Sequence, residues 1–168
     1  RRALERKVLK LARTDHLTGL LNRGAGDEAL TREVERARRY GRPLSCLLLD
    51  VDHFKKINDG AGHAAGDHVL RLLGALIAGR IRTADSAARW GGEEFLLVLP
   101  ETNSRGACEF AESLRALVEA TSFELVPRVT VSIGVTELRP DEPREQALAR
   151  ADKHLYTAKS NGRNRVEG

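Results

Sequence analysis

Acidic residues stand at two places where the sequence pattern predicts the end of one strand and the turn before another. Asp50 ends the apolar run LSCLLLD, and Glu93 and Glu94 follow two glycines and precede the apolar run FLLVLP. If the two strands are neighbours in a sheet, these carboxylates converge and repel one another unless a cation neutralises them. Oxygen ligands without His or Cys favour Mg²⁺ or Mn²⁺, and Mg²⁺ usually completes its shell with water and phosphate. The pattern therefore favours a site that handles a nucleotide triphosphate.

Residues beside these acids have mainly structural interpretations. Taken alone, Asp50 would more often belong to a helix cap or a solvated turn, and its pairing with the Gly-Gly-Glu-Glu turn is what favours a binding site. Asp52 would share the face of Asp50 if the strand continued, and we interpret it as structural rather than as a ligand. Gly91 and Gly92 are expected to provide the positive φ angles of a tight hairpin turn. They also leave the backbone free of side chains, so a ligand can lie against it.

The elements that position these residues are predicted from apolar spacing and from the residues that break helices. Helices are expected at about Gly26–Tyr40, Asp67–Ile81, Ser104–Ala120 and Arg144–Ser160, with only a helical turn and a loop before the second. Strands are expected at Leu44–Asp52, on both sides of the turn within Ala88–Pro100, and at Arg128–Val135. This alternation predicts an α/β or α+β fold with one central sheet covered by helices.

The first residues predict a separate amphipathic helix. Leu4, Val8 and Leu11 recur at a spacing of three to four residues with charges between them, which is typical of a coiled-coil seam. We interpret residues 1–13 as a signalling helix cut from a longer protein whose upstream part is a sensor. The alternative is an ordinary helix packed on its own domain. Residues 14–168 then form one domain, which their number suits.

Composition narrows the class of protein. Apolar residues make up 41% and charged residues 31% of the 168, as in soluble globular proteins. No apolar run approaches the length of about 20 residues that a membrane-spanning helix needs. The charged first residues also lack the pattern of a signal peptide. Cys46 and Cys108 have no CxxC spacing, which argues against zinc or a disulfide framework and favours a cytoplasmic location. The net charge of +4 favours anionic partners only weakly, because acids interleave with the bases. We expect neither nucleic-acid binding nor direct membrane contact.

Several segments resemble the GGDEF family of diguanylate cyclases, in the family's order and with its spacing. The signature is matched by GGEEF, and the opening motif by DHLTGLLNR. The metal and phosphate segment is matched by DVDHFKKIND, and the next motif by GHAAGD. The closing strand and helix are matched by VTVSIGV and ADKHLYTAKSNGRN. The resemblance runs from about Asp15 to Asn164 and implies a cyclase-palm or polymerase-palm fold, with a mostly antiparallel sheet of about five strands surrounded by helices. It also implies condensation of two GTP molecules into cyclic di-GMP and pyrophosphate.

The resemblance implies a metal site made of carboxylates and one carbonyl. Asp50, the backbone carbonyl of Val51 and Glu93 would hold two Mg²⁺ or Mn²⁺ ions, with Glu94 beside them. Glu93 would also accept the proton of the attacking 3′-hydroxyl. Asp50, Glu93 and Glu94 are therefore the catalytic candidates.

The resemblance also implies where the nucleotide lies. Guanine would pair with Asn58 and Asp67, and His63 would line that pocket. The triphosphate would lie against the backbone amides of His53 and Phe54, held by Lys55, Lys159 and Arg163, and Gly91 and Gly92 would also belong to the substrate site. Amides at a turn together with cationic side chains do form an anion site. For the last two cations, a solvated basic end to the final helix is the alternative. For His63, a loop or packing role is the alternative.

Two further motifs lie outside the active site. Asp15, Asn22 and Arg23 are interpreted as structural residues that make turn and cap hydrogen bonds, and they can also relay the state of the upstream helix. Arg82 and Asp85 resemble the RxxD site at which the family's product binds and inhibits, since Arg can stack on guanine and Asp can accept from it. Many inhibited members carry a second arginine on the following helix. Ser113 stands at that place here.

The number of nucleotide pockets in each domain determines what the reaction requires, and two alternative functions remain. Each domain would hold one GTP, so the resemblance implies a homodimer brought together by an upstream coiled coil. One alternative is a module that binds GTP or cyclic di-GMP without turnover, whose usual mark is a broken signature. The other is a palm-type cyclase that uses ATP, against which Asn58 and Asp67 argue.

Overall fold

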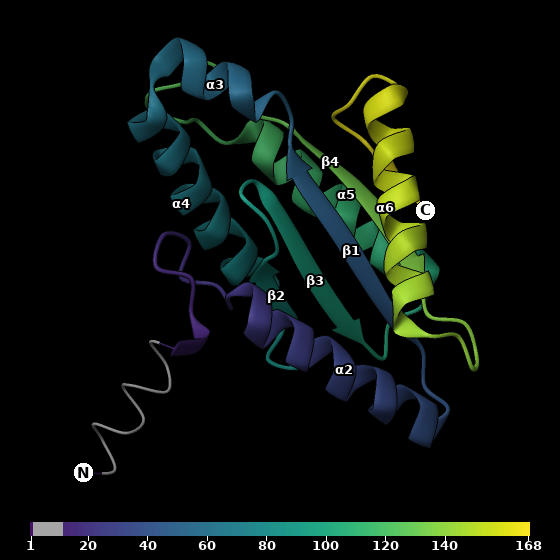
Figure 1. Ribbon diagram of the computed structural model, residues 1–168. Coiled ribbons are helices and arrows are strands. Elements are labelled where there is room, and N and C mark those ends of the chain that lie inside the picture. The colour runs from purple at the N-terminus through teal and green to yellow at the C-terminus, as the bar shows by residue number, and fades with distance from the viewer. Residues whose placement is uncertain (2–11) are drawn as a thin grey trace.

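The computed structural model describes residue 1 and residues 12–168, so the helix expected around residues 4–11 lies outside the described part. The described residues form five helices and five strands (Figure 1). The helices are α2 (Arg23–Tyr40), α3 (Phe54–Ala61), α4 (His63–Arg80), α5 (Ser104–Ala120) and α6 (Arg144–Ser160). The strands are β1 (Leu44–Val51), β2 (Ser86–Arg89), β3 (Glu94–Pro100), β4 (Val131–Glu137) and β5 (Val166–Glu167).

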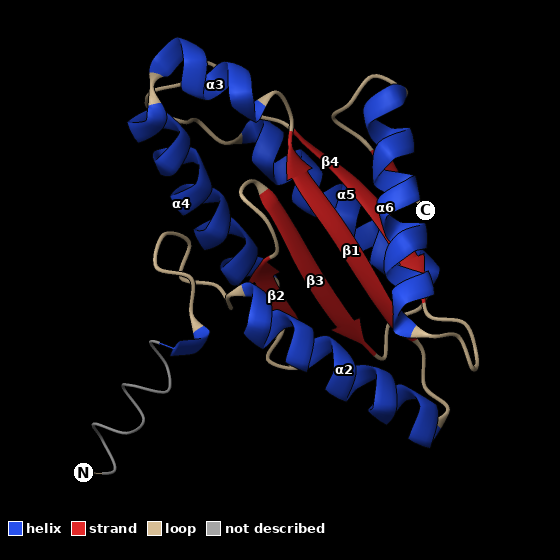
Figure 2. Ribbon diagram, viewed as in Figure 1, coloured by secondary structure: helices blue, strands red, loops and turns tan. Residues whose placement is uncertain are grey.

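One sheet runs through the middle of the domain in the order β2-β3-β1-β4-β5. The pairs β2–β3, β3–β1 and β1–β4 are antiparallel, and only β4–β5 is parallel. Helices cover both faces of this sheet (Figure 2). Every residue of the central strand β1 is buried, as its unbroken apolar run predicts. The expected mixed α/β fold with a mostly antiparallel five-stranded sheet is confirmed.

Alternate side chains of β1 serve two different cores. Cys46 and Leu48 pack with residues of α2 and α6, whereas Leu47 and Leu49 pack with residues of α4 and α5. Because side chains alternate along a strand, Asp50 belongs with the first set and faces the α6 side. The two-residue period therefore decides which helix can reach the acid at the end of β1.

Some element boundaries differ from the sequence-based expectation. The segment expected to be a helical turn and a loop is two helices, α3 and α4, separated only by Gly62 with φ 88°. The helix α2 starts three residues early because the Asn22 side chain accepts from the Ala25 amide and caps it. The strand β4 starts and ends later than expected, and β5 was not expected because its two residues carry no periodic pattern. No helix among the described residues is both long and apolar enough to cross a membrane.

A close contact between the sheet and a helix occurs at Gly134 in β4. A Cβ atom there would lie 2.1 Å from the Ala151 carbonyl oxygen and 2.4 Å from the Leu155 amide nitrogen, both in α6. These are backbone atoms of a helix, so they have no rotamer through which to move away. Glycine at this position therefore lets α6 lie directly on the sheet.

We expect Gly134→Ala to destabilise the domain by about 3 kcal/mol or more, because the new methyl group overpacks a rigid contact. The melting temperature should fall by roughly 6 to 12 °C in a thermal unfolding experiment. The control is Gly79→Ala near the end of α4, where a Cβ meets nothing within 4 Å among the described residues. Alanine is the better helix former, so this control should gain up to about 1 kcal/mol. Equal melting temperatures for the two variants would contradict the close contact.

Candidate active site

Adjacent strands bring the expected acids to one end of the sheet. In the antiparallel register of β1 and β3, Asp50 stands directly opposite Glu94. The Val51 amide donates to the Glu93 carbonyl at 3.3 Å, which ties the acidic turn to the end of β1. Like charges directly across a strand pair destabilise a sheet. The arrangement therefore costs stability unless something positive lies between the carboxylates.

A lysine supplies positive charge to Asp50. The Lys159 ammonium at the end of α6 donates to Asp50 Oδ2 at 2.5 Å, across 109 positions of sequence. Burial of Asp50 nevertheless raises its pKa to about 6, and repulsion by Glu93 and Glu94 adds to that rise while the lysine opposes it. The ionised carboxylate is therefore disfavoured even with the lysine in contact, and a cation of higher charge would suit it better.

The donor set fits a hard divalent cation. Within the described part, no three acidic, His or Cys side chains already lie close enough to hold a metal ion. Asp50, Glu93 and Glu94 nonetheless offer carboxylate oxygens at the same end of the sheet, which we call the acidic edge. The raised pKa of Asp50 indicates that its carboxylate would be stabilised by more positive charge nearby. Oxygen donors of this kind suit Mg²⁺ or Mn²⁺ and do not suit zinc.

Asp52 is occupied by structural hydrogen bonds. Its carboxylate accepts from the hydroxyls of Thr130 at 2.7 Å and Ser132 at 2.6 Å, and from the Asn164 amide at 2.9 Å. The side chain is buried and both of its oxygens are in use. The expectation that Asp52 is structural is confirmed.

The acidic turn, which joins the end of β2 at Arg89 to the start of β3 at Glu94, is wider than the tight hairpin turn that was expected. The Trp90 and Gly91 amides both donate to the Glu94 carbonyl, at 2.7 and 3.2 Å. Gly91 and Gly92 do not have positive φ angles, so the expected reason for these glycines is wrong. A Cβ on Gly91 would instead come within 3.0 Å of a Glu94 carboxylate oxygen, whereas one on Gly92 would project into open space. The expectation that a ligand lies against the backbone at these glycines stays a prediction.

An arginine that the sequence analysis did not single out holds this turn. Arg89 donates twice to the Gly92 carbonyl, at 3.0 and 2.8 Å, and once to Asp15 at 3.2 Å. Burial raises the pKa of Asp15, but hydrogen bonds from Thr18 and the charge of Arg89 outweigh it and leave the pKa below its ordinary value. The position of Arg89, two residues before GGEEF, is the signal that would have identified it.

The other residues of the opening motif also make structural contacts. Arg23 lies with its guanidinium 4.3 Å from the centre of the Trp90 ring and donates to the Trp90 carbonyl at 2.8 Å. Asn22 caps α2 with its side-chain oxygen and donates through its amide nitrogen to the Ala12 carbonyl. The turn role expected for Asp15 and the cap role expected for Asn22 are confirmed, whereas Arg23 contacts Trp90 and makes neither a turn nor a cap hydrogen bond.

The residues expected to read a base lie on α3 and α4. Asn58 packs against Gly66, where a Cβ atom would lie only 1.9 Å from Asn58 Oδ1. That oxygen is buried and has no hydrogen-bond partner among the described residues. A buried acceptor without a donor costs free energy, so the position suits a ligand that donates to it. Asp67 and His63 are exposed on α4, in its first turns.

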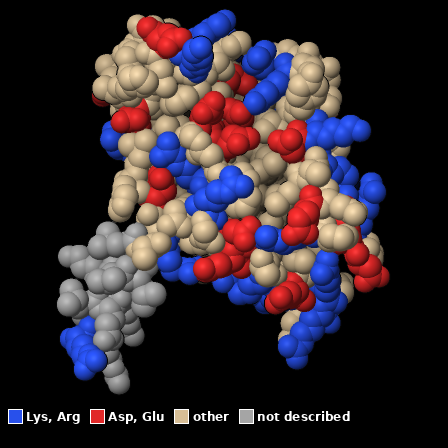
Figure 3. Space-filling view, viewed as in Figure 1, with Lys and Arg blue, Asp and Glu red and all other residues tan. Residues whose placement is uncertain are grey.

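The residues expected to bind phosphate surround the same end of the sheet. His53 starts α3 with a positive φ of 55°, and in the described structure no side chain caps the first amides of this helix. Uncapped amides at a helix start are available to an anion. Lys55 is exposed on α3, Arg163 is exposed after α6, and Lys159 reaches Asp50 from α6. Figure 3 shows acidic atoms gathered over the end of β1 and the start of β3, with basic atoms beside them.

The RxxD residues lie at the other side of β3. Arg82 binds Asp85 through two of its nitrogens, at 3.2 and 2.8 Å, and also donates to Thr102. The Asp85 side chain is only 1% exposed, whereas that of Arg82 is 59% exposed and faces solvent. Arg80, at the end of α4, donates to the Ser113 hydroxyl on α5. A guanidinium therefore stands beside Ser113, although it comes from a different helix than the resemblance implies.

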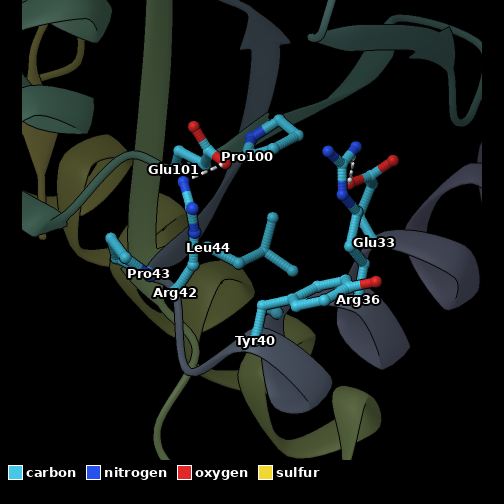
Figure 4. A pocket seen from close by; sticks show the side chains of 9 residues that line it. Glu33, Arg36, Tyr40, Arg42, Pro43, Leu44, Pro100 and Glu101 are labelled. Atoms are coloured by element: carbon cyan, nitrogen blue, oxygen red, sulfur yellow. Dashed lines mark hydrogen bonds and ion pairs between the residues drawn. The ribbon is translucent and has the colours of Figure 1, made fainter.

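A separate pocket lies at the opposite end of β1 and β3, between Leu44 and Pro100 (Figure 4). Tyr40 lies along one side of it, and the ion pair of Arg42 with Glu101 at 2.8 Å flanks another. None of the residues expected to bind metal or nucleotide lines it. The end of the sheet that carries Asp50, Glu93 and Glu94, and not this pocket, is therefore the candidate active site.

A mostly antiparallel sheet that carries paired carboxylates at one edge, with cations and uncapped amides around them, defines a nucleotide-cyclase-like domain. The chain belongs to the GGDEF domain family. A family model described as "Diguanylate cyclase, GGDEF domain" matches residues 12–165.

Curated relatives support the assignment to the family. The chain is 45% identical to diguanylate cyclase DgcP of Pseudomonas aeruginosa, over 93% of this chain and 24% of that protein. It is 44% identical to the response regulator PleD of Caulobacter vibrioides, over 95% of this chain and 37% of that protein. The chain thus spans about a quarter to two fifths of the length of these relatives.

Solved structures agree with the fold. The GGDEF domain of DgcB from Caulobacter crescentus, determined in complex with c-di-GMP, is 37% identical, with a TM-score of 0.89 over 93% of this chain and 95% of that one. The active GGEEF domain of a diguanylate cyclase from Vibrio cholerae is also 37% identical, with a TM-score of 0.84 over 88% of this chain and 96% of that one.

The raised pKa of Asp50 predicts a stability that depends on pH. Its folded pKa of about 6 lies above the ordinary value of 3.8, so its stabilising contribution is full below about pH 4 and is lost as the pH rises through 6. Asp50→Asn keeps the shape and removes the charge. At pH 8 without metal we expect this variant to melt a few degrees above the wild type, since 1 kcal/mol corresponds to roughly 3 °C in a domain of this size.

The difference between the two proteins should vanish at pH 4 in the same thermal scans. Asp59→Asn, which removes an exposed acid on α3, is the control and should melt like the wild type at both pH values. A variant at position 50 that melts below the wild type at pH 8 would show that the bond to Lys159 outweighs burial.

Proposed function

We propose that this chain is a diguanylate cyclase domain, which joins two GTP molecules into cyclic di-GMP and releases two pyrophosphates. The observation that carries the proposal is the Asp50–Glu94 pair across β1 and β3, with Glu93 in the adjoining turn and an excess of negative charge that only a cation relieves. Family membership and relatives named as diguanylate cyclases support it.

The carboxylates have proposed roles in the transfer. Asp50, the Val51 carbonyl, Glu93 and Glu94 would hold two Mg²⁺ or Mn²⁺ ions, which when bound lower the charge on phosphoryl oxygens and orient the reacting groups. Glu93 accepts the proton of the 3′-hydroxyl as that oxygen attacks the α-phosphorus of the second GTP. The bond from the α-phosphorus to the pyrophosphate oxygen breaks, and a second round in the opposite sense closes the ring.

The nucleotide is proposed to lie between α3, the acidic turn and the end of α6. Asn58 and Asp67 pair with the guanine edge, which distinguishes GTP from ATP, and His63 lines that pocket. The buried and unsatisfied Asn58 Oδ1 supports this role, because guanine offers donors to it.

The triphosphate has its own proposed set of contacts. It lies against the bare backbone of Gly91 and Gly92, and the rest of its contacts are the amides of His53 and Phe54 and the side chains of Lys55, Lys159 and Arg163. Lys159, which bonds Asp50 in the described structure, exchanges that carboxylate for a phosphate oxygen.

Catalysis needs two domains, because each offers one nucleotide site. We therefore propose a homodimer in which two sites face each other. An upstream sensor joined through residues 1–13 would control the encounter by raising the local concentration of the partner. A cytoplasmic location fits a GTP-consuming domain of this kind.

Product inhibition is proposed at Arg82 and Asp85. The buried Asp85 carboxylate holds the Arg82 backbone amide and its guanidinium, while the Arg82 side chain as a whole stays 59% exposed. Arg80 beside Ser113 offers a second cation on the same side of the molecule. Cyclic di-GMP carries guanine edges and phosphates that suit such a pair of arginines.

Turnover of GTP with Mg²⁺ tests the proposed function. Glu93→Gln keeps the size of the side chain and removes the proton acceptor, so we expect formation of cyclic di-GMP to fall by about a hundredfold or more. Chromatography of the reaction measures it. Glu109→Gln on the exposed face of α5 is the control and should retain full activity.

The same experiment separates the alternatives. Product from the Glu93 variant at the wild-type rate would contradict the assigned site. Protein that makes no product even when an added leucine zipper forces dimerisation, yet binds GTP, would be a binding module instead. Turnover of ATP in place of GTP would remove the roles given to Asn58 and Asp67.

For the inhibitory site, Arg82→Ala should raise the concentration of cyclic di-GMP that halves the rate by about tenfold or more, because a charge-assisted hydrogen bond to the product is lost. Initial rates with added product measure this. Arg105→Ala removes an exposed arginine from α5 and is the control, with no expected change. Unaltered inhibition in the Arg82 variant would place the product elsewhere.

A further inference from the structure

The turn after α6 has an unusual backbone. Gly162, Arg163 and Asn164 all have positive φ angles, of 114°, 63° and 48°. Residues other than glycine rarely adopt this conformation, and asparagine tolerates it better than most. Two such residues in succession persist only where surrounding contacts determine the backbone. Contacts outside the turn must therefore hold it.

The buried Asp52 carboxylate is one of these contacts. It accepts from the Asn164 backbone amide at 2.9 Å, while the hydroxyls of Thr130 and Ser132 hold the same carboxylate in place. Asp52 follows β1 directly, so the turn is tied to the strand that carries Asp50.

The Asn164 side chain makes the second set of contacts, to α5. Its Oδ1 accepts from Arg115 at 2.7 Å, and its amide nitrogen donates to Glu119. The Arg115 side chain is only 14% exposed and also binds Glu112, which fixes its direction. The backbone amide of Asn164 and both polar atoms of its side chain are therefore engaged.

We propose that Asp52 and Asn164 are positioning residues that fix the cations at the end of α6 against the acidic sheet edge. The turn that they hold contains Arg163 and follows Lys159, which already bonds Asp50 across the same edge. We call the contacts of Asp52 and Asn164 with this turn the clamp. Without the clamp the side chains of Lys159 and Arg163 would no longer be held near the acids, so the clamp sets the affinity for the triphosphate. The hydrogen bonds of the clamp are present in the structure, and its effect on GTP binding rests on the proposed function.

Two variants of Asn164 separate backbone conformation from side-chain contacts. Asn164→Ala and Asn164→Gly lose the same bonds to α5, but only glycine adopts the positive φ without strain. We expect the alanine variant to weaken binding of a non-hydrolysable GTP analogue, measured by calorimetry with Mg²⁺, by about tenfold. The glycine variant should be weakened clearly less.

Kinetics should show the same division. The KM for GTP should rise with the dissociation constant, whereas kcat at saturating GTP should change by less than about threefold, because the reacting groups are untouched. Asn161→Ala is the matched control, since Asn161 is exposed near the same turn but has a negative φ of −82°. Its KM should equal that of the wild type. An unchanged KM in Asn164→Ala would overturn the proposal.

Hydrogen exchange keeps this test independent of the proposed function. In nucleotide-free protein the Asn164 amide should exchange slowly, and Asp52→Asn, which keeps an oxygen acceptor, should retain most of that protection. Asp52→Ala should lose it while the amides of β1 stay protected. Wild-type protein without cyclase activity would defeat the proposed function alone. Rapid exchange of the Asn164 amide in the wild type would defeat the clamp.

Discussion

Repulsion between carboxylates on neighbouring buried strands is the constraint on which the rest of this domain depends. The register of β1 and β3 sets Asp50 opposite Glu94, and burial leaves the ionised form of Asp50 disfavoured even in contact with Lys159. A fold selected for stability alone would avoid this arrangement. The arrangement suits the proposed cation site, because such a site needs negative charge that is incompletely neutralised beforehand.

Contacts from distant parts of the chain hold the segments that surround the acidic edge. Gly134 lets α6 lie directly on β4, which carries Lys159 to the level of Asp50. Arg89 ties the acidic turn to the opening segment through the Gly92 carbonyl. These contacts come from distant parts of the chain, so the geometry of the edge is a property of the whole sheet and its covering helices.

The sequence allowed much of this to be predicted, for reasons that differ between elements. β1 and the helices α5 and α6 carry long, regular patterns, and their bounds were predicted to within about one residue. The segment around GHAAGD was predicted as a loop because glycines lower helix propensity, yet packing against the core makes it helical. The bond of Lys159 to Asp50 spans 109 positions, and no local pattern reports such a contact. The acidic turn is wide enough that its glycines need no positive φ. Its width depends on the hydrogen bonds to the Glu94 carbonyl, which the sequence could not predict either.

The fit of Asn58 against Gly66 links two positions that ordinary sequence motifs treat separately. A single methyl group at residue 66 would occupy the space of the Asn58 side-chain oxygen, so residue 66 can be enlarged only if the side chain at position 58 changes as well. A lineage that acquired a larger residue at position 66 would have to replace or move the Asn58 amide, which is the group proposed to bind guanine. Under that proposal, a substitution at residue 66 should be accompanied by one at residue 58.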